Sequence, residues 1–228
     1  MYIEGRLSLD NPQYGAALEM VGAGNSAAMG AKRVLTVQQM SDRTYRIYMA
    51  LEAPEAITRP GGNADLADLE KARAAMLKPG GYFDGCSEHL RAFIAAAEGP
   101  WRPWPLYRLD PDIYLPAAEG GSWTHVPGIT LLGDAAHLAT PNGEGVNQAM
   151  YDALVLFDSI LSELRSNKSD EGNIKDADEA AIDRAVTTYE ADMFPRARHH
   201  INDGIQFEAN MFVEDAVERL MAMFNDAS

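Results

Sequence analysis

Cysteine is almost absent from this sequence. Cys86 is the only one, which rules out an internal disulfide and a zinc site built from several thiolates. A chain without disulfides fits a reducing compartment. Its first residues, MYIEGRLSLD, also lack the basic and apolar regions of a secretory signal. We therefore expect a cytoplasmic protein.

Positive charge and long apolar runs are scarce as well. The 19 lysines and arginines stand against 34 acidic residues, which gives a formal net charge of −15. Such a charge repels nucleic acid and anionic membrane surfaces. No apolar run approaches the roughly 20 residues that span a bilayer. The expected partner is a small molecule, with neither nucleic acid nor a membrane involved.

Hydrolase and metal motifs are missing too. The sequence has no G-x-S-x-G string, and His199 and His200, adjacent on a predicted helix, point in different directions and cannot share a metal. His137 follows Asp134 by three residues, so an acid–base pair is one alternative. We expect no metal site and assign no catalytic side chain.

The most informative stretch begins at Ile129. Residues 129–132 form a short apolar run of strand type that ends at Gly133 and Asp134. After a loop, apolar residues recur every three or four positions, as on one face of a long helix: Val146, Ala149, Met150, Ala153, Leu154, Phe157, Ile160, Leu161 and Leu164. The pattern predicts a strand, an acidic turn, a glycine loop and a helix.

This unit suits a polar ligand. Gly143 and Gly145 let the backbone approach a flat or anionic group. The free N–H groups of a helix that begins near Val146 favour a polarised carbonyl or a phosphate. Asp134 can accept hydrogen bonds from sugar or ribityl hydroxyls. The glycines alone are equally consistent with a structural turn.

The combination of GDAAH, Pro141, Gly143-x-Gly145-x-Asn147 and Asp152-Ala153 resembles the second flavin-binding motif of the FAD-dependent aromatic hydroxylases. This class includes para-hydroxybenzoate hydroxylase and the tetracycline-modifying monooxygenases. The resemblance implies FAD and NADPH as cofactors. It implies that Asp134 contacts the ribityl and pyrophosphate region and that the loop passes beside the isoalloxazine ring. The implied cofactor-binding residues are Gly133, Asp134, Pro141, Gly143, Gly145, Val146 and Asn147. One residue fewer than usual separates His137 from Gly143.

The chain before this motif has the pattern of an antiparallel sheet. Residues 3–9 alternate as in a strand, and 34–39 and 44–51 read as a hairpin. In the second hairpin strand, Arg46 and Tyr48 share one face. The resembled family binds its substrate between such a sheet and the flavin, so these two residues are candidates to orient a phenolic or enolic substrate. A solvated sheet face is the alternative.

Other segments are expected to be scaffold. Gly22-x-Gly24-x-x-Ala27 imitates a dinucleotide fingerprint, but too few residues follow for a crossover helix, so a turn is predicted. Further expectations are a helix over 64–77, a second capped by Asp84 or Ser87, a strand over 106–109, a surface loop over 166–178 and C-terminal helices interrupted at Pro195.

Together these patterns predict an α/β (α+β) fold. An antiparallel substrate-domain sheet with helices (1–128) precedes the C-terminal portion of a flavin-binding domain (129–165) and a C-terminal helix pair (166–228). The resemblance implies a monooxygenase that hydroxylates an aromatic or polyketide-like molecule. The family's first half has no counterpart here, which indicates a fragment of a longer protein, a half that needs a partner chain to supply the rest, or a truncated form. The alternative is a flavin-free homologue that rearranges, cyclises or merely binds a similar polycyclic substrate.

Overall fold

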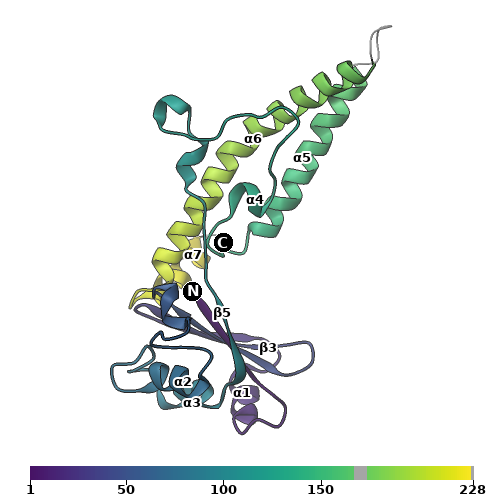
Figure 1. Ribbon diagram of the computed structural model, residues 1–228. Coiled ribbons are helices and arrows are strands. Elements are labelled where there is room, and N and C mark those ends of the chain that lie inside the picture. Colours follow the sequence, from purple (N-terminus) through teal and green to yellow (C-terminus); the bar gives the residue numbers. More distant parts are fainter. Residues whose placement is uncertain (167–173, 227–228) are drawn as a thin grey trace. The chain divides into compact units, whose positions relative to one another are not determined.

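A computed structural model describes residues 1–166 and 174–226 of the chain. The contacts divide it into two compact units: unit 1 comprises Met1–Leu106 with Ala209–Ser228, and unit 2 comprises Tyr107–Glu208. Figure 1 shows the elements of each. The three-part functional division at residues 128 and 165 remains a prediction, because compactness does not report function.

Unit 1 is built on a five-stranded antiparallel sheet with the order β2-β3-β4-β1-β5. The strands are β1 (Tyr2–Leu7), β2 (Asn25–Gly30), β3 (Arg33–Gln39), β4 (Tyr45–Leu51) and β5 (Glu98–Trp104). The mixed fold class and the β3–β4 hairpin are therefore confirmed. Glu4 lies opposite Tyr48 and Arg6 opposite Arg46, which gathers polar side chains from two strands on one face.

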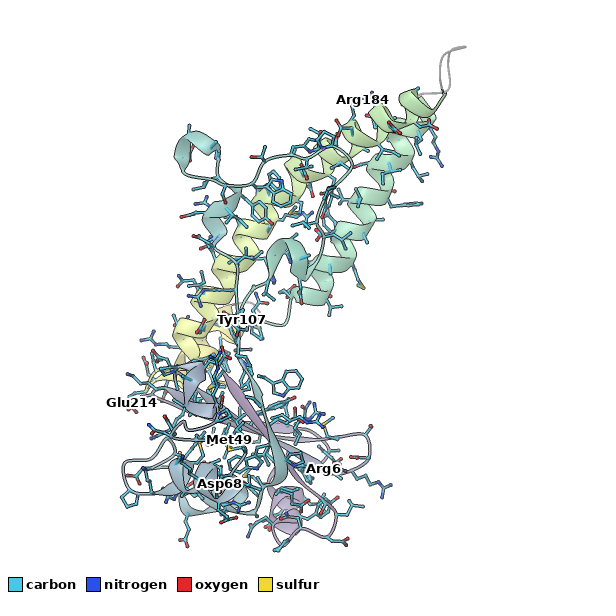
Figure 2. The ribbon with its side chains drawn as sticks, in the orientation of Figure 1. Arg6, Met49, Asp68, Tyr107, Arg184 and Glu214 are labelled. Carbon is cyan, nitrogen blue, oxygen red and sulfur yellow. The ribbon has the colours of Figure 1, made fainter. Side chains whose placement is uncertain are left out.

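The other face of the sheet carries the core of unit 1. Tyr45, Ile47 and Met49 alternate inward along β4 and are fully buried. They belong to one cluster with residues of α1 (Tyr14–Val21), α2 (Leu69–Leu77) and α3 (Glu88–Ala96). Figure 2 shows Met49 in this region and Asp68 at the start of α2. Period-two alternation thus separates an apolar face from a polar one.

The glycines after α1 form a turn. Gly22 has φ 62° and ends α1, with its N–H donating to the carbonyl of Leu18 at 3.0 Å. The chain then enters β2, which pairs antiparallel with β3. No crossover helix separates the two strands, so the expected structural turn is confirmed.

One helix start and one strand differ from expectation. The helix predicted over 64–77 begins at Leu69, because the Asp68 carboxylate caps it by accepting from the N–H of Lys71 at 3.1 Å. The strand predicted over 106–109 is wrong, since the last strand is β5, which pairs with β1 and ends at Trp104. Ser87 does occupy the cap position of α3, although its side chain makes no capping bond.

Unit 2 contains α4 (Asp134–His137), α5 (Gly145–Ser166) and most of α6 (Ile174–Met211). Its buried cluster is formed by Tyr114, Ala136, Tyr189, Met193, Ala197 and Ile201. Single-turn helices complete the two units: η1 (Glu55–Thr58), η2 (Pro111–Tyr114) and η3 (Ala117–Glu119). The helices α5 and α6 lie alongside each other, linked by an ion pair between Glu163 and Arg184 at 2.8 Å (Figure 1).

The predicted strand over 129–132 is absent. One isolated bridge between Val126 and Ile129 is the only sheet-type pairing there. A strand needs a neighbour for its backbone hydrogen bonds, and no other described strand pairs with this segment. Side chains of α6 hold it instead: the Tyr189 hydroxyl donates to the carbonyl of Leu131 at 2.9 Å, and the Thr130 hydroxyl donates to Glu190 at 3.0 Å.

The C-terminal helices also break at a different place. Pro195 lies inside α6, which continues to Met211, and α7 (Ala216–Asp226) follows. Proline removes one helical hydrogen bond, but Tyr189, Met193 and Ala197 are buried on either side of it and keep the helix packed. Residues 174–178 of the expected surface loop are helical; residues 167–173 lie outside the described part. No described helix is long and apolar enough to cross a membrane.

Candidate functional site

The turn at Gly133 and Asp134 is set by a glycine-specific conformation. Gly133 has φ 60°, and a Cβ there would lie 3.3 Å from the Cβ of Ala149. A larger residue would therefore be strained and crowded. Asp134 begins α4, and its side chain is exposed. The turn leaves this carboxylate available to a ligand.

A buried carboxylate on α5 holds the turn in place. Asp152 is fully buried and accepts three hydrogen bonds: from the N–H of Gly133 at 2.9 Å, from Nε2 of His137 at 2.7 Å and from Nη1 of Arg196 at 3.0 Å. Arg196 also pairs with Asp192 at 2.7 Å. The Asp152 network therefore ties the turn to α4, α5 and α6. Sequence reasoning assigned Asp152 to the motif without giving it this role; a lone acid between apolar neighbours was the available signal.

His137 belongs to this network and does not pair with Asp134. The side chain is almost fully buried, and its Nδ1 atom has no hydrogen-bond partner among the described residues. The ring of His200 meets it edge to face at 5.3 Å. Burial, followed by the electrostatic influence of His137, lowers the pKa of His200. The structure thus pairs His137 with Asp152, and it shows no hydrogen bond between His137 and Asp134.

The glycine loop leads to an open helix start. Gly143 has φ 89°, and a Cβ there would meet nothing within 4 Å. The first helical hydrogen bond of α5 runs from the N–H of Gln148 to the carbonyl of Glu144 at 3.0 Å. The N–H groups of the three residues between Glu144 and Gln148 therefore have no helical acceptor. Those residues are Gly145, Val146 and Asn147. The Glu144 carboxylate lies beside this end, 3.4 Å from Nδ2 of Asn147. A neutral polarised carbonyl suits the position better than a phosphate.

Two buried tyrosines fix the segments on either side of the turn. The hydroxyl of Tyr114 donates to the carbonyl of Ala136, and that of Tyr189 donates to Leu131. Burial raises the pKa of Tyr114 to about 12, and the pKa of Tyr189 is also raised, chiefly by burial. Both hydroxyls therefore remain neutral donors at neutral pH.

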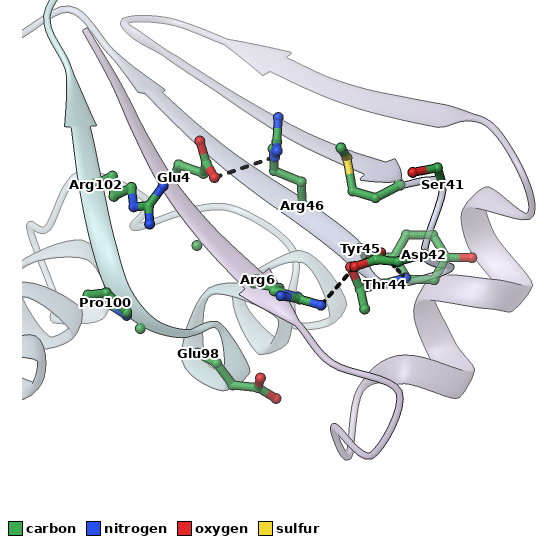
Figure 3. A pocket seen from close by; sticks show the side chains of 13 residues that line it. Glu4, Arg6, Ser41, Asp42, Thr44, Tyr45, Arg46, Glu98, Pro100 and Arg102 are labelled. Carbon is green, nitrogen blue, oxygen red and sulfur yellow. Dashed lines mark hydrogen bonds and ion pairs between the residues drawn. The ribbon is translucent and has the colours of Figure 1, made fainter.

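A second candidate site lies in unit 1, on the polar face of the sheet. Figure 3 shows this pocket of about 360 Å³. Arg46 pairs with Glu4 at 3.4 Å, and Arg6 pairs with Asp42 at 2.9 Å. Arg102 of β5 also lines the pocket and has no carboxylate partner among the described residues. Glu98 lines the pocket as well, so its three arginines are balanced by three acids, and Arg102 is the arginine that no carboxylate holds in an ion pair among the described residues.

Tyr48 lies next to this pocket, outside its lining. Its hydroxyl accepts a hydrogen bond from Nη1 of Arg46 at 2.9 Å. The indole N–H of Trp104 donates to Glu4 at 2.9 Å. Arg46 and Tyr48 were candidates from the sequence, whereas Glu4 and Arg102 were not. Only the strand register, which places β1 between β4 and β5, brings all of them together.

Metal binding finds no support in the part of the chain that the structure describes. No group of three or more histidine, cysteine or acidic side chains is arranged to hold an ion. His199 is exposed and pairs with Asp203 at 3.2 Å, whereas His200 is buried. The two adjacent histidines thus point apart, as expected.

Two curated proteins are similar in sequence. "Monooxygenase penA" of Penicillium thymicola is 28% identical over 211 residues, which cover 79% of this chain and 46% of that protein. "Monooxygenase asqM" of Emericella nidulans is 27% identical over 232 residues, covering 86% and 50%. The chain spans about half the length of the curated relatives it matches. No protein-family profile matches the sequence.

Solved structures share the fold. HpxO of Klebsiella pneumoniae, complexed with FAD and uric acid, aligns with a TM-score of 0.60 at 20% identity, over 99% of this chain and 47% of that one. FqzB aligns with a TM-score of 0.61 at 18% identity, over 100% and 48%. The chain therefore resembles monooxygenases in sequence and shares its fold with a protein crystallised with FAD.

Proposed function

We propose that this chain forms the substrate-binding part and a portion of the flavin-binding part of an FAD-dependent, NADPH-using monooxygenase. The observation that carries the proposal is the Gly133–Asp134 turn, which the buried carboxylate of Asp152 fixes near an open helix start. The substrate is an aromatic or polyketide-like small molecule. Sequence similarity to two monooxygenases supports this activity.

The exposed groups of the turn and loop fit FAD. The Asp134 carboxylate accepts hydrogen bonds from ribityl hydroxyls. The residues that hold or approach the cofactor are Gly133, Asp134, Pro141, Gly143, Gly145, Val146 and Asn147. The free N–H groups at the start of α5 donate to a carbonyl of the flavin ring. When bound, FAD supplies the oxygen-transfer chemistry and NADPH its electrons.

The sheet pocket fits a phenolic or enolic substrate. Its volume of about 360 Å³ lies within the range of small-molecule sites. Arg46 orients the acidic hydroxyl through a charge-assisted hydrogen bond, and Tyr48, beside the pocket, contributes by accepting a hydrogen bond from Arg46 at 2.9 Å. Arg102 supplies a second positive charge from β5. We assign no side chain of this chain as a proton-transfer group.

The remaining cofactor contacts come from the half of such a protein that this chain does not match. The chain matches only 46% and 50% of its two relatives. The other half of such a protein is available to bind the rest of FAD. We therefore expect weak FAD binding by this chain alone and tighter binding in the presence of that half.

An FAD fluorescence titration tests the proposal. It is run on the purified chain, alone and mixed with the portion of the Penicillium thymicola protein that this chain does not match. Asp134→Ala should weaken binding by roughly tenfold to a hundredfold, because one charged hydrogen bond is worth about 1.5–3 kcal/mol. Asp158→Ala, an exposed carboxylate on α5, is the matched control. Equal affinities for wild type and Asp134→Ala would refute the assignment.

A flavin-free homologue is the second candidate. It is favoured by the sheet pocket, whose lining residues all lie in unit 1 and need no cofactor. Such a protein rearranges, cyclises or binds a polycyclic substrate without redox chemistry. Calorimetry with 4-hydroxybenzoate, on wild type and on Arg46→Ala, measures this binding without FAD. This candidate would be favoured if 4-hydroxybenzoate binds and FAD does not, even when the portion of the Penicillium thymicola protein that this chain does not match is present.

A further inference from the structure

Asn142 and Gly143 form the only Asn-Gly pair in the sequence, and they lie in the loop before α5. In such a pair the backbone nitrogen of the glycine attacks the side-chain amide carbon of the asparagine, because glycine has no Cβ to obstruct the approach. Gly143 is exposed, and a Cβ built on it would meet nothing within 4 Å. The surroundings of Gly143 therefore leave room for this reaction.

The loop leaves both reacting nitrogens without hydrogen bonds. Neither the N–H of Gly143 nor Nδ2 of Asn142 has a partner among the described residues. Asn147, five residues later, differs in this respect, because the N–H that follows it belongs to Gln148 and is bonded to the carbonyl of Glu144 at 3.0 Å. Nucleophile and leaving group are thus both free at Asn142, whereas α5 holds the corresponding nitrogen after Asn147.

A backbone donor activates the side-chain amide of Asn142. The N–H of Glu144 donates to Oδ1 of Asn142 at 3.0 Å, which folds the side chain back along the turn. This hydrogen bond makes the amide carbon more electrophilic. It also stabilises the negative charge that develops on Oδ1 when a nucleophile adds, as the donors of an oxyanion hole do. The turn thus supplies both proximity and activation for attack by Gly143.

We propose that Asn142 is a site of spontaneous modification, at which the side chain cyclises onto Gly143 and is then hydrolysed to a carboxylate. The Gly143 nitrogen loses its proton to solvent and bonds to Cγ of Asn142, and Nδ2 leaves as ammonia. Water then opens the resulting succinimide at one of its two carbonyls, which gives aspartate or isoaspartate at position 142. The overall reaction consumes one water and releases one ammonia, and no atom is oxidised or reduced.

The product lies beside the proposed cofactor site, so its effect on FAD rests on the proposed function. Position 142 is three residues before Gly145, where α5 begins with free N–H groups. A carboxylate at this end competes with a flavin carbonyl for those N–H groups, because helix starts favour anions. Isoaspartate also lengthens the backbone by one carbon and displaces the loop. Either product should therefore lower the affinity for FAD, by about tenfold.

Peptide mapping by mass spectrometry tests the modification without any flavin. The full chain is incubated in mildly alkaline buffer, folded and unfolded in guanidinium, and conversion is followed at Asn142, Asn147 and Asn25. Asn25 is exposed and precedes the small residue Ser26, but the ladder of β2 with β3 fixes its backbone. In the folded chain Asn142 should convert about tenfold faster, or more, than either control, because only its turn brings the reacting groups together.

The unfolded chain separates the effect of the turn from that of the dipeptide. Folded Asn142 should convert at least as fast as in guanidinium, because the turn already holds the amide in its activated form. Conversion that is slower in the folded chain than in the unfolded chain, or no faster than at Asn25 and Asn147, would overturn the proposal.

An FAD titration of two variants tests the consequence. It is run together with the portion of the Penicillium thymicola protein that this chain does not match. Asn142→Asp introduces the product carboxylate, whereas Asn142→Ser keeps an acceptor for the Glu144 N–H and stays neutral. Asn142→Asp should bind FAD about tenfold more weakly than Asn142→Ser. Equal affinities would overturn the effect on the cofactor. Absence of FAD binding in wild type as well would refute the proposed function and leave the modification, which is measured without FAD, intact.

Discussion

Replacing Asp152 by alanine should destabilise unit 2 severely. The carboxylate is fully buried and accepts hydrogen bonds from Gly133, His137 and Arg196 at 2.9, 2.7 and 3.0 Å. Its removal leaves the guanidinium without its buried counter-charge and the Gly133 N–H without an acceptor. Breaking a buried charge pair on one side costs about 3–5 kcal/mol. This is a large fraction of the roughly 5–15 kcal/mol by which a domain is stable.

Urea unfolding followed by circular dichroism measures this loss. Asp158→Ala makes the same change at an exposed position on the same helix, and it should alter the free energy of unfolding by at most about 0.5 kcal/mol. Asp152→Asn keeps the shape and one acceptor oxygen, so its loss should fall between these two values. A loss below about 1 kcal/mol for Asp152→Ala would refute the claim that the Asp152 network holds the turn.

Two further changes test the same region. Gly133→Ala should destabilise by about 1–3 kcal/mol in the same urea assay, because φ is 60° and the new Cβ lies 3.3 Å from Ala149; an unchanged midpoint would refute the crowding. Hydrogen bonds to Glu190, then Asp183, raise the pKa of His125 above its ordinary 6.5. The stability that these hydrogen bonds supply should be complete below pH 6.5 and should fall as the pH rises through the raised pKa of His125. The difference in free energy of unfolding between wild type and His125→Gln should therefore shrink over that range; a difference independent of pH would contradict this.

The Asp152 network explains why the motif from Gly133 to Asp152 needs particular residues at several positions. Gly133 is required by its backbone angle, and Asp152, nineteen residues later, is required by the Gly133 N–H. His137 fills the space between them and meets His200. Of these residues, only Gly133 is proposed to approach the cofactor. They position Asp134, whose carboxylate alone faces solvent.

Local patterns were sufficient to predict several elements. The alternation along β4 predicted that Arg46 and Tyr48 share one face, and the structure shows that Tyr45, Ile47 and Met49 on the opposite face are buried. The acidic turn and the helix after the glycine loop also lie where the sequence indicated. Such features depend on residues close in sequence, so periodicity and glycine placement are enough to find them.

Features that depend on distant residues were missed. The register of β1 against β4 brings Glu4 to the pocket, and no local signal encodes it. The apolar periodicity of α5 was correct, but periodicity cannot tell whether a partner covers that side of a helix. The same limit explains the strand predicted over 129–132, because a strand forms only where another strand pairs with it. The helix interruption predicted at Pro195 does not occur, because buried residues on both sides of the proline keep α6 packed.

Hydrogen exchange of the glycine loop with and without FAD tests the central claim most directly. It is measured on the chain mixed with the unmatched portion of the Penicillium thymicola protein. The account predicts that FAD slows exchange of the free amides of Gly145, Val146 and Asn147, and that Asp134→Ala abolishes this effect at the same FAD concentration. FAD that binds to the complex without changing exchange at these three amides would contradict the account.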